Sequence, residues 1–123
     1  YGLERICMFT QSKNNVFDLN WNNDGVKYKD IFHQAEEEYS AYNFEFANIE
    51  NLLKSFDMAE IECKSLLEKK LTLPGYDQCL KASHIFNLLD ARGVIGVAQR
   101  TEYISRIREL AKGAGQSWLE NQK

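Results

Sequence analysis

Asn48-Ile49-Glu50-Asn51-Leu52-Leu53-Lys54-Ser55-Phe56-Asp57-Met58-Ala59-Glu60-Ile61-Glu62-Cys63-Lys64-Ser65-Leu66-Leu67 is the stretch that decides the fold. Its apolar residues recur at the three- and four-residue spacing of an α-helix with one buried face. Asn48 is a residue type that caps helix N-termini. Lys69 and Lys70, which follow, suit the negative end of a helix dipole. The pattern therefore predicts an amphipathic helix from Asn48 to about Lys70.

Toward the carboxyl end the pattern predicts two more helices. The first covers about 74–92, has Pro74 in its first turn and is apolar on most sides, which is typical of a central, covered helix. Gly93 and Gly96 bracket a turn. The second covers about 98–121 and is weakened near its end by glycines. Its apolar face consists of Tyr103, Ile107, Leu110, Ala111, Ala114 and Trp118.

Toward the amino end, helical spacing of apolar residues begins near Lys29 and continues to Tyr42. Residues 12–28 contain turn residues on both sides of the apolar segment 16–21, so we expect a loop that is packed down. No strand-like alternation follows the first few residues. The fold class expected is mostly α: a bundle of about four helices after a strand-to-helix segment.

The first eleven residues bear the best candidate for chemistry. Gly2 is followed by the charged pair Glu4-Arg5 and then by the apolar run 6–9, which indicates a strand that leads into a buried helix. At such a junction Gly2 would let a ligand approach the backbone. Arg5 would offer a flat cation that stacks on a base and a donor fork that binds phosphate. The alternative is a structural Arg5, paired with Glu4 or another neighbour.

Composition describes an ordinary soluble globular domain. The chain has 123 residues, of which 44% are hydrophobic and 27% charged. No apolar run reaches the roughly 18 residues of a membrane span, and no signal peptide is visible. With no initiator Met and no polar lead-in, we expect the sequence to continue from an upstream part. The net charge of −3 argues against nucleic-acid binding through bulk electrostatics by this chain alone.

The cysteine and histidine residues predict no metal site. Cys7, Cys63 and Cys79 are odd in number and far apart, so we expect buried free thiols in a reducing compartment. No zinc-type spacing is present. His33 and His84 are expected to be hydrogen-bonded structural residues. Asp90 and Arg92, two positions apart on a helix, do not face each other and are expected to anchor neighbouring elements.

Charge is distributed unevenly along the chain. Residues 30–68 contain ten Asp or Glu and two Lys, whereas residues 81–112 contain six Lys or Arg and three acids. One interpretation is solvated faces with pairing between helices of the two halves. The other is a partner face for RNA or another subunit. The second would be built from Arg100, Arg106, Arg108 and Lys112.

Gly2-Leu3-Glu4-Arg5, followed by an apolar helix that ends at Gln11, resembles the third signature motif of class II aminoacyl-tRNA synthetases. It is similar to the motif of two relatives, the bacterial glycyl-tRNA synthetase α subunit and alanyl-tRNA synthetase. Later segments resemble the carboxyl-terminal part of the glycyl α subunit, in the same order: Asp18-Leu19-Asn20-Trp21, Phe32-His33-Gln34, Tyr42-Asn43-Phe44-Glu45 and His84-Ile85-Phe86-Asn87-Leu88-Leu89-Asp90-Ala91-Arg92. One departure is Gly96-Val97-Ala98-Gln99-Arg100, where the family commonly has a Ser-Val-Thr-Glu-Arg type of helix start.

The resemblance implies a fold and a site. Residues 1–28 would end the antiparallel-sheet catalytic core, and 29–123 would form a helical carboxyl-terminal domain. Arg5 would be the catalytic residue and would stack on the adenine of ATP, and Gly2 would complete the ATP-binding pair. Mg²⁺ would enter with ATP as substrate. The two other class II motifs and the glycine pocket would lie upstream, so this chain alone is expected to be inactive.

The resemblance also implies an activity and partners. The enzyme would activate glycine as glycyl-adenylate and charge tRNA(Gly), in a cytoplasmic assembly of two α and two β subunits without a membrane. A first alternative is a fragment of alanyl-tRNA synthetase. A second is a non-enzymatic helical protein-interaction module. The module would be marked by an ion-paired Arg5 and by an exposed apolar patch on the last helix.

Overall fold

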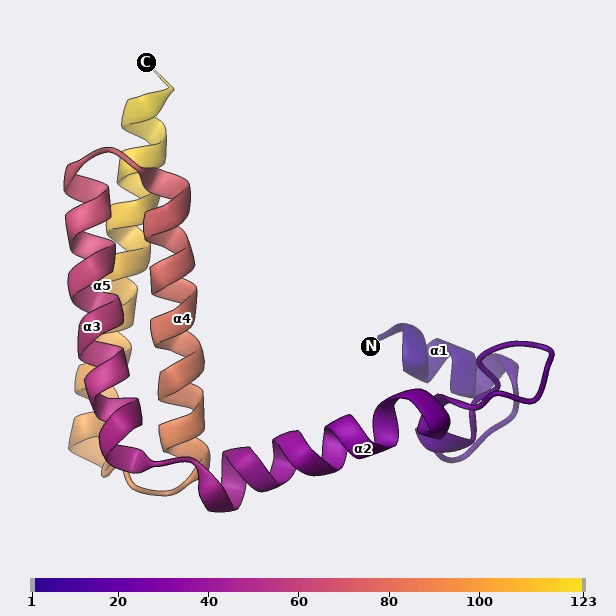
Figure 1. The fold of residues 1–123 in the computed structure, drawn as a ribbon. Helices are drawn as coiled ribbons and strands as arrows, with labels where there is room; N and C mark the ends of the chain where they lie inside the picture. Colours follow the sequence, from indigo (N-terminus) through magenta and orange to yellow (C-terminus); the bar gives the residue numbers. More distant parts are fainter. Residues whose placement is uncertain (1, 123) are drawn as a thin grey trace. The chain divides into compact units, whose positions relative to one another are not determined.

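The computed structural model describes residues 2–122 and divides into two compact units, Tyr1–Tyr42 and Asn43–Lys123 (Figure 1). Across these described residues there is no strand, only an isolated bridge between Asn20 and Lys27. The mostly α fold is therefore confirmed. In chain order the elements are α1 (Leu3–Thr10), the 3-10 turn η1 (Val16–Asp18), α2 (Tyr28–Ala41), the π-helical turn η2 (Tyr42–Phe46), α3 (Ile49–Glu68), α4 (Thr72–Ala91) and α5 (Val97–Asn121).

The division between the units falls after Tyr42, later in the chain than the boundary between residues 28 and 29 that the family resemblance implies. A compact unit is defined by packing, whereas the implied boundary separates a catalytic core from a helical domain. Assignment of 1–28 to such a core therefore stays a prediction.

The second unit is a bundle of α3, α4 and α5. The helix predicted from Asn48 is confirmed, because the Asn48 side chain caps it by accepting a hydrogen bond from the Asn51 amide at 3.0 Å. The helix ends at Glu68, beside the two lysines. α4 begins at Thr72, so Pro74 does lie in the first turn. α4 packs against both neighbours, as its all-round apolar character predicted.

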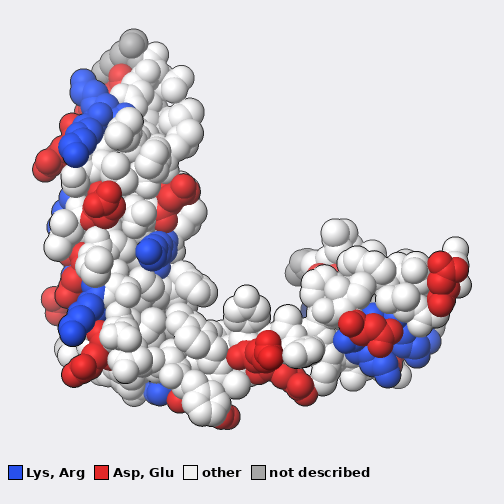
Figure 2. Space-filling model, in the orientation of Figure 1, with Lys and Arg blue, Asp and Glu red and all other residues white. Residues whose placement is uncertain are grey.

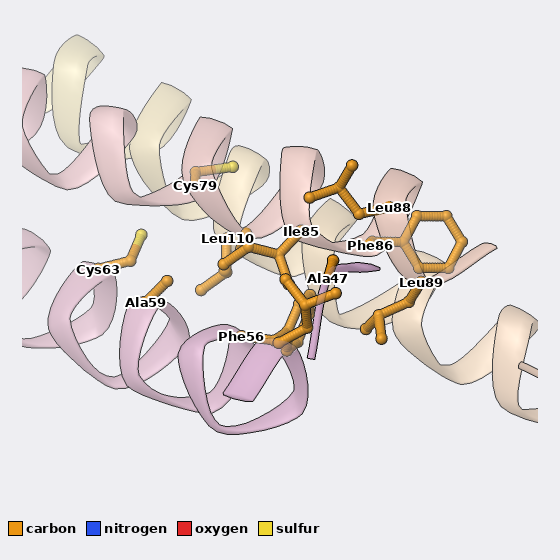
Figure 3. Packing of buried hydrophobic residues seen from close by; sticks show 12 residues of the cluster. Ala47, Phe56, Ala59, Cys63, Cys79, Ile85, Phe86, Leu88, Leu89 and Leu110 are labelled. Atoms are coloured by element: carbon orange, nitrogen blue, oxygen red, sulfur yellow. The ribbon is translucent and has the colours of Figure 1, made fainter. Parts of the chain in front are cut away.

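Leucine, phenylalanine, alanine and cysteine side chains from the three helices form one core (Figure 3). Phe56, Cys63, Leu89 and Leu110 are fully buried. Burial of a Phe or Leu side chain stabilises by about 1.5–3 kcal/mol. Burial also raises the pKa of the Cys63 and Cys79 thiols, since it disfavours the thiolate. These two cysteines are the buried free thiols that the sequence predicted.

Ion pairs and hydrogen bonds join the bundle helices. Arg106 on α5 donates from Nη2 to Asp57 and Glu60 on α3 at 2.8 Å, and from Nε to Glu60 at 2.9 Å. Arg100 lies 3.4 Å from Asp90, and Arg92 donates to the Ala47 carbonyl at 2.6 Å. Pairing between the acidic and basic halves is therefore confirmed for Arg106, whereas Arg100 pairs with Asp90 inside the basic half. Asp90 and Arg92 are anchors, as predicted.

The structure shows how α5 begins at Gly96-Val97-Ala98-Gln99-Arg100, where the sequence departs from the family pattern. Gly96 is the N-cap, and its amide donates to the Gln99 side chain at 3.2 Å. Gln99 thus makes the bond that a Glu at this position makes in a capping box. The helix begins at Val97, one residue before the prediction, and continues through Gly113 and Gly115 to Asn121.

The first unit is held together by aromatic side chains from the loop and α2. Phe32 packs with Tyr28 (ring centroids 4.7 Å apart) and with Trp21 (5.5 Å). Phe17 contacts His33 edge-on at 4.8 Å, and Leu19 is buried beneath the loop. The packed loop is confirmed. Because Tyr28 and Phe32 at the start of α2 pack on this loop, α2 belongs to the first unit. The expected bundle of about four helices therefore has three.

Three expectations, for the start of the chain, for Cys7 and for His84, are wrong. Residues 2–122 contain no strand before α1: the Gly2 carbonyl already accepts from the Ile6 amide at 3.3 Å, so the chain is helical from Leu3, and Tyr1 lies outside the described residues. Cys7 is exposed, because α1 buries none of its residues. Trp118 lies beside Ala111 and Ala114 on the predicted apolar face of α5 and is 48% exposed at a groove. His84 lies on the outer face of α4, with no side-chain hydrogen bond in the described part of the chain.

Candidate functional site

Arg5 lies in the first turn of α1 with its side chain exposed. The helix begins after Gly2, whose backbone is extended (φ −139°, ψ 168°), a conformation open to any residue. Gly2 is therefore not required for the turn. A Cβ placed on Gly2 would lie 3.1 Å from Oε2 of Glu4, so the glycine keeps space free beside that carboxylate.

Arg5 shares its side of α1 with exposed apolar residues. Successive residues turn by about 100° along a helix, so Arg5, Phe9 and Ile6 lie on one side, and Leu3, Cys7 and Gln11 lie on the other. Phe9 is 87% exposed and Ile6 56% exposed. An eight-residue helix that presents such a face is suited to pack against a further surface.

The structure offers Arg5 no partner within the described residues. Among residues 2–122 the ion pairs are made by His33, Arg100 and Arg106, and none involves Arg5. Glu4, the expected structural partner, lies on a different side of the helix and suits the positive end of the helix dipole. The paired, structural Arg5 is therefore not seen among residues 2–122.

A cavity of about 390 Å³ lies on the opposite side of α1. It is lined by Leu3, Glu4, Cys7, Gln11, Leu19, Asn20, Trp21, Tyr28 and Phe32. The lining residues include no Lys or Arg, so the cavity does not provide the positive charge that a triphosphate needs. The pKa of Tyr28 is raised, chiefly by burial and then by the negative charges of Glu4 and Glu36. The arrangement favours an apolar or neutral group there.

Gln11 fixes the loop to α1, a role that sequence reasoning missed. Its Oε1 accepts from the Asn20 amide at 2.8 Å and its Nε2 donates to the Asn20 carbonyl at 3.3 Å. Next to Asn20, the Leu19 carbonyl accepts a hydrogen bond from the Tyr28 amide at 2.8 Å, which ties the end of the loop to its middle. The sequence shows a Gln at the end of a short helix, which is a possible hydrogen-bonding residue. Its partner Asn20 lies nine residues further along the chain, so local sequence patterns do not predict the pair.

Residues 2–122 contain no group of three or more His, Cys, Asp or Glu side chains placed to hold a metal ion. His33 lies 3.6 Å from Glu37 on the same helix and packs against Phe17. In the same range, none of the helices combines the length and the apolar character needed to cross a membrane.

The site thus consists of an exposed Arg5 in the first turn of α1, without an ion pair among residues 2–122, and of Gly2 directly before the helix. A family model described as "Glycyl-tRNA synthetase alpha subunit" matches residues 1–123, the full length of the sequence. This match agrees with the resemblance seen in the Gly2–Arg5 motif and in the downstream segments. The chain therefore belongs to the glycyl-tRNA synthetase alpha subunit family.

Proposed function

We propose that this chain supplies one part of the ATP site of a glycine–tRNA ligase, together with a helical domain of its α subunit. The family to which the chain belongs is a family of aminoacyl-tRNA synthetase subunits. The observation that carries the proposal is the family match over the whole chain. Arg5 in the matching motif is exposed and has no ion pair in the described part of the chain, which is consistent with the proposal.

In the proposed reaction the glycine carboxylate attacks the α-phosphorus of ATP, the bond to the β,γ-diphosphate breaks, and pyrophosphate leaves. The glycyl-adenylate then acylates the terminal ribose of tRNA(Gly). In-line chemistry of this kind depends on positioning and on charge stabilisation more than on a covalent residue. Arg5 would stack its flat guanidinium on adenine and neutralise phosphate charge. Gly2 would leave room for the nucleotide at the start of α1.

The side of α1 that carries Arg5 would have a second role. Phe9 and Ile6, exposed beside Arg5, would pack against the rest of the catalytic core. Burial of these side chains would hold the helix, and with it Arg5, at a fixed angle to the nucleotide.

The proposed assembly has two α and two β subunits and works in the cytoplasm, with Mg²⁺ brought in as the ATP complex. The family name itself specifies an α subunit, which implies a β subunit and tRNA as partners. The net charge of −3 fits a division of labour in which the β subunit makes much of the tRNA contact. This chain alone is expected to be inactive.

The experiment is amino-acid-dependent ATP–pyrophosphate exchange by the complete gene product with its β subunit. We expect exchange with glycine and not with alanine, and a fall of about a hundredfold in Arg5→Ala, which corresponds to about 2.7 kcal/mol of transition-state stabilisation. Arg5→Lys should also lose most of the activity, because Lys keeps the charge but not the flat stacking group. Lys29→Ala, which removes an exposed cation of the same unit, is the matched control.

Other outcomes lead to the alternatives. Exchange with alanine would favour an alanyl-tRNA synthetase. Absence of exchange with either amino acid, from a folded complex, would favour the helical interaction module. Normal ATP binding and exchange in Arg5→Ala would remove Arg5 from the site.

A further inference from the structure

A shallow apolar groove of about 240 Å³ runs between the first half of α4 and the last half of α5. Its lining residues are Thr72, Leu73, Tyr76, Ala111, Ala114, Gly115 and Trp118. Leu73 is 64% exposed, and Trp118 keeps almost half of its surface in solvent. Large apolar side chains gathered in this way mark interaction sites more often than isolated exposed ones do.

The floor and walls of the groove have different side chains. On α5, Ala111 and Gly115 are small and one turn apart, so another backbone is able to approach closely. Leu73 and Tyr76 form the α4 wall, and Trp118 closes the α5 end. A floor of small residues between apolar walls fits the apolar side chains of an amphipathic helix.

The α4 wall of the groove continues as an apolar ridge toward Leu80, next to the exposed carboxylate of Asp77. Leu80 is 49% exposed one turn beyond Tyr76, on the same side of the helix. In Figure 2 the right-hand side of the bundle is uncharged near its top, and acidic and basic side chains follow below it on the same side. The apolar surface therefore extends beyond the groove along α4.

The open border of the groove on α5 is cationic. Arg108 and Lys112 are one turn apart and flank Ala111 and Gly115 on the side away from α4. Neither takes part in an ion pair within residues 2–122, in contrast to Arg100 and Arg106 on the same helix. An occupant with carboxylates along this edge would match the charge, and one with cations would be repelled.

We propose that this groove is the docking site for a helix of the β subunit that is apolar on one face and acidic along the edge facing Arg108 and Lys112. The identification of the partner as the β subunit rests on the proposed function. The apolar groove supplies the buried contact, centred on Trp118, a residue type common in binding hot spots. The cations select the orientation and speed the association of the acidic helix.

Gly115→Glu in the complete gene product tests the site, because it puts a carboxylate on the groove floor. A Cβ at Gly115 meets nothing within 4 Å, so the bundle itself accepts the side chain. We expect the dissociation constant for the purified β subunit, measured by sedimentation or interferometry, to rise about tenfold or more. Gly115→Ala, which adds only a methyl group, should bind within about threefold of the wild type. Unchanged helicity and melting temperature establish that the variants are folded.

Reversal of the two cations is an independent test. The double variant Arg108→Glu/Lys112→Glu should bind the β subunit about tenfold more weakly at low salt, and its binding should depend less on salt. The matched control is Lys54→Glu/Lys64→Glu, which makes the same charge change on exposed positions of α3. We expect this control to bind as the wild type does.

Two results would overturn the docking site. One is β-subunit binding that stays unchanged in folded Gly115→Glu, including the case in which the variant only dissociates a homodimer. The other is a wild-type chain that does not bind the β subunit. Glycine-dependent exchange reports separately on the proposed function: its absence from a complex that Gly115→Glu still disrupts would remove the ligase and keep the docking site.

Discussion

At the scale of single residues, Arg106 contacts two carboxylates and two aromatic rings. It bonds to Asp57 and Glu60 on α3, and its guanidinium lies 4.7 Å from the ring centre of Phe56 and 5.1 Å from that of Tyr103. These contacts join the charged surface to the buried core. They also lower the pKa of the Glu60 carboxyl, chiefly through the hydrogen bond from Arg106.

The lowered pKa of Glu60 predicts a pH-dependent stability. The folded chain binds fewer protons at Glu60 than the unfolded chain does, so its contribution is present above the ordinary carboxyl pKa of about 4.3 and is lost as pH falls through the lower folded value. At pH 7 we expect Glu60→Gln to reduce the free energy of unfolding by about 1 kcal/mol. Urea unfolding between pH 7 and pH 3 should show this difference vanish toward pH 3. A difference that persists at pH 3 would assign the effect to packing.

At the scale of secondary-structure elements, glycines decide how closely the bundle helices approach. Gly75 on α4 lies against α3, where an added Cβ would be 2.8 Å from Cδ2 of Leu67. The turn between α3 and α4 is closed by the Leu71 amide, which donates to the Leu66 carbonyl at 2.9 Å. The small residue thus allows the close crossing that follows this turn.

The same substitution, Gly→Ala, should change the free energy of unfolding differently at Gly115 and at Gly75. Gly115→Ala, in open space on α5, should raise the free energy of unfolding by about 0.5–1 kcal/mol, because alanine favours the helix. Gly75→Ala should bring no gain or a loss, since its methyl group must displace Leu67. Thermal and chemical unfolding of the 123-residue chain measure both changes. Equal stabilisation by the two substitutions would show that Leu67 moves aside freely.

At the scale of the whole molecule, the two units differ in how much they bury. The second unit has a core of twelve buried residues, whereas Leu19 is the one buried residue among residues 2–42. Local stability follows the amount of buried apolar contact. We therefore expect the units to open separately.

Hydrogen exchange of the 123-residue chain tests this difference. Amides in the middle of α4, covered by helices on two sides, should be protected at least roughly a hundredfold more than those of α1 and α2. The amides of α4 should exchange only on global unfolding. Uniform protection across both units would contradict the expectation and indicate a single cooperative molecule.

The sequence by itself determined what depends on near neighbours in the chain. Helical periodicity placed α3, α4 and α5 within about two residues of their observed ends, and residue chemistry identified the Asn48 cap and Pro74 in a first turn. Motif order identified the family and selected Arg5. These features were predictable because a helix, its caps and its buried stripe are specified by residues within a few positions of one another.

Only the tertiary structure decided which surfaces meet. It paired α2 with the aromatic loop, exposed Cys7, joined Gln11 to Asn20, and left Trp118 beside a groove. It also placed Arg5 on the side of α1 away from the cavity. The physical reason is that periodicity distinguishes the apolar side of a helix from its polar side but does not specify which element packs against the apolar side. The partners depend on residues far apart in the chain, and an apolar side without one within the chain is left for another molecule.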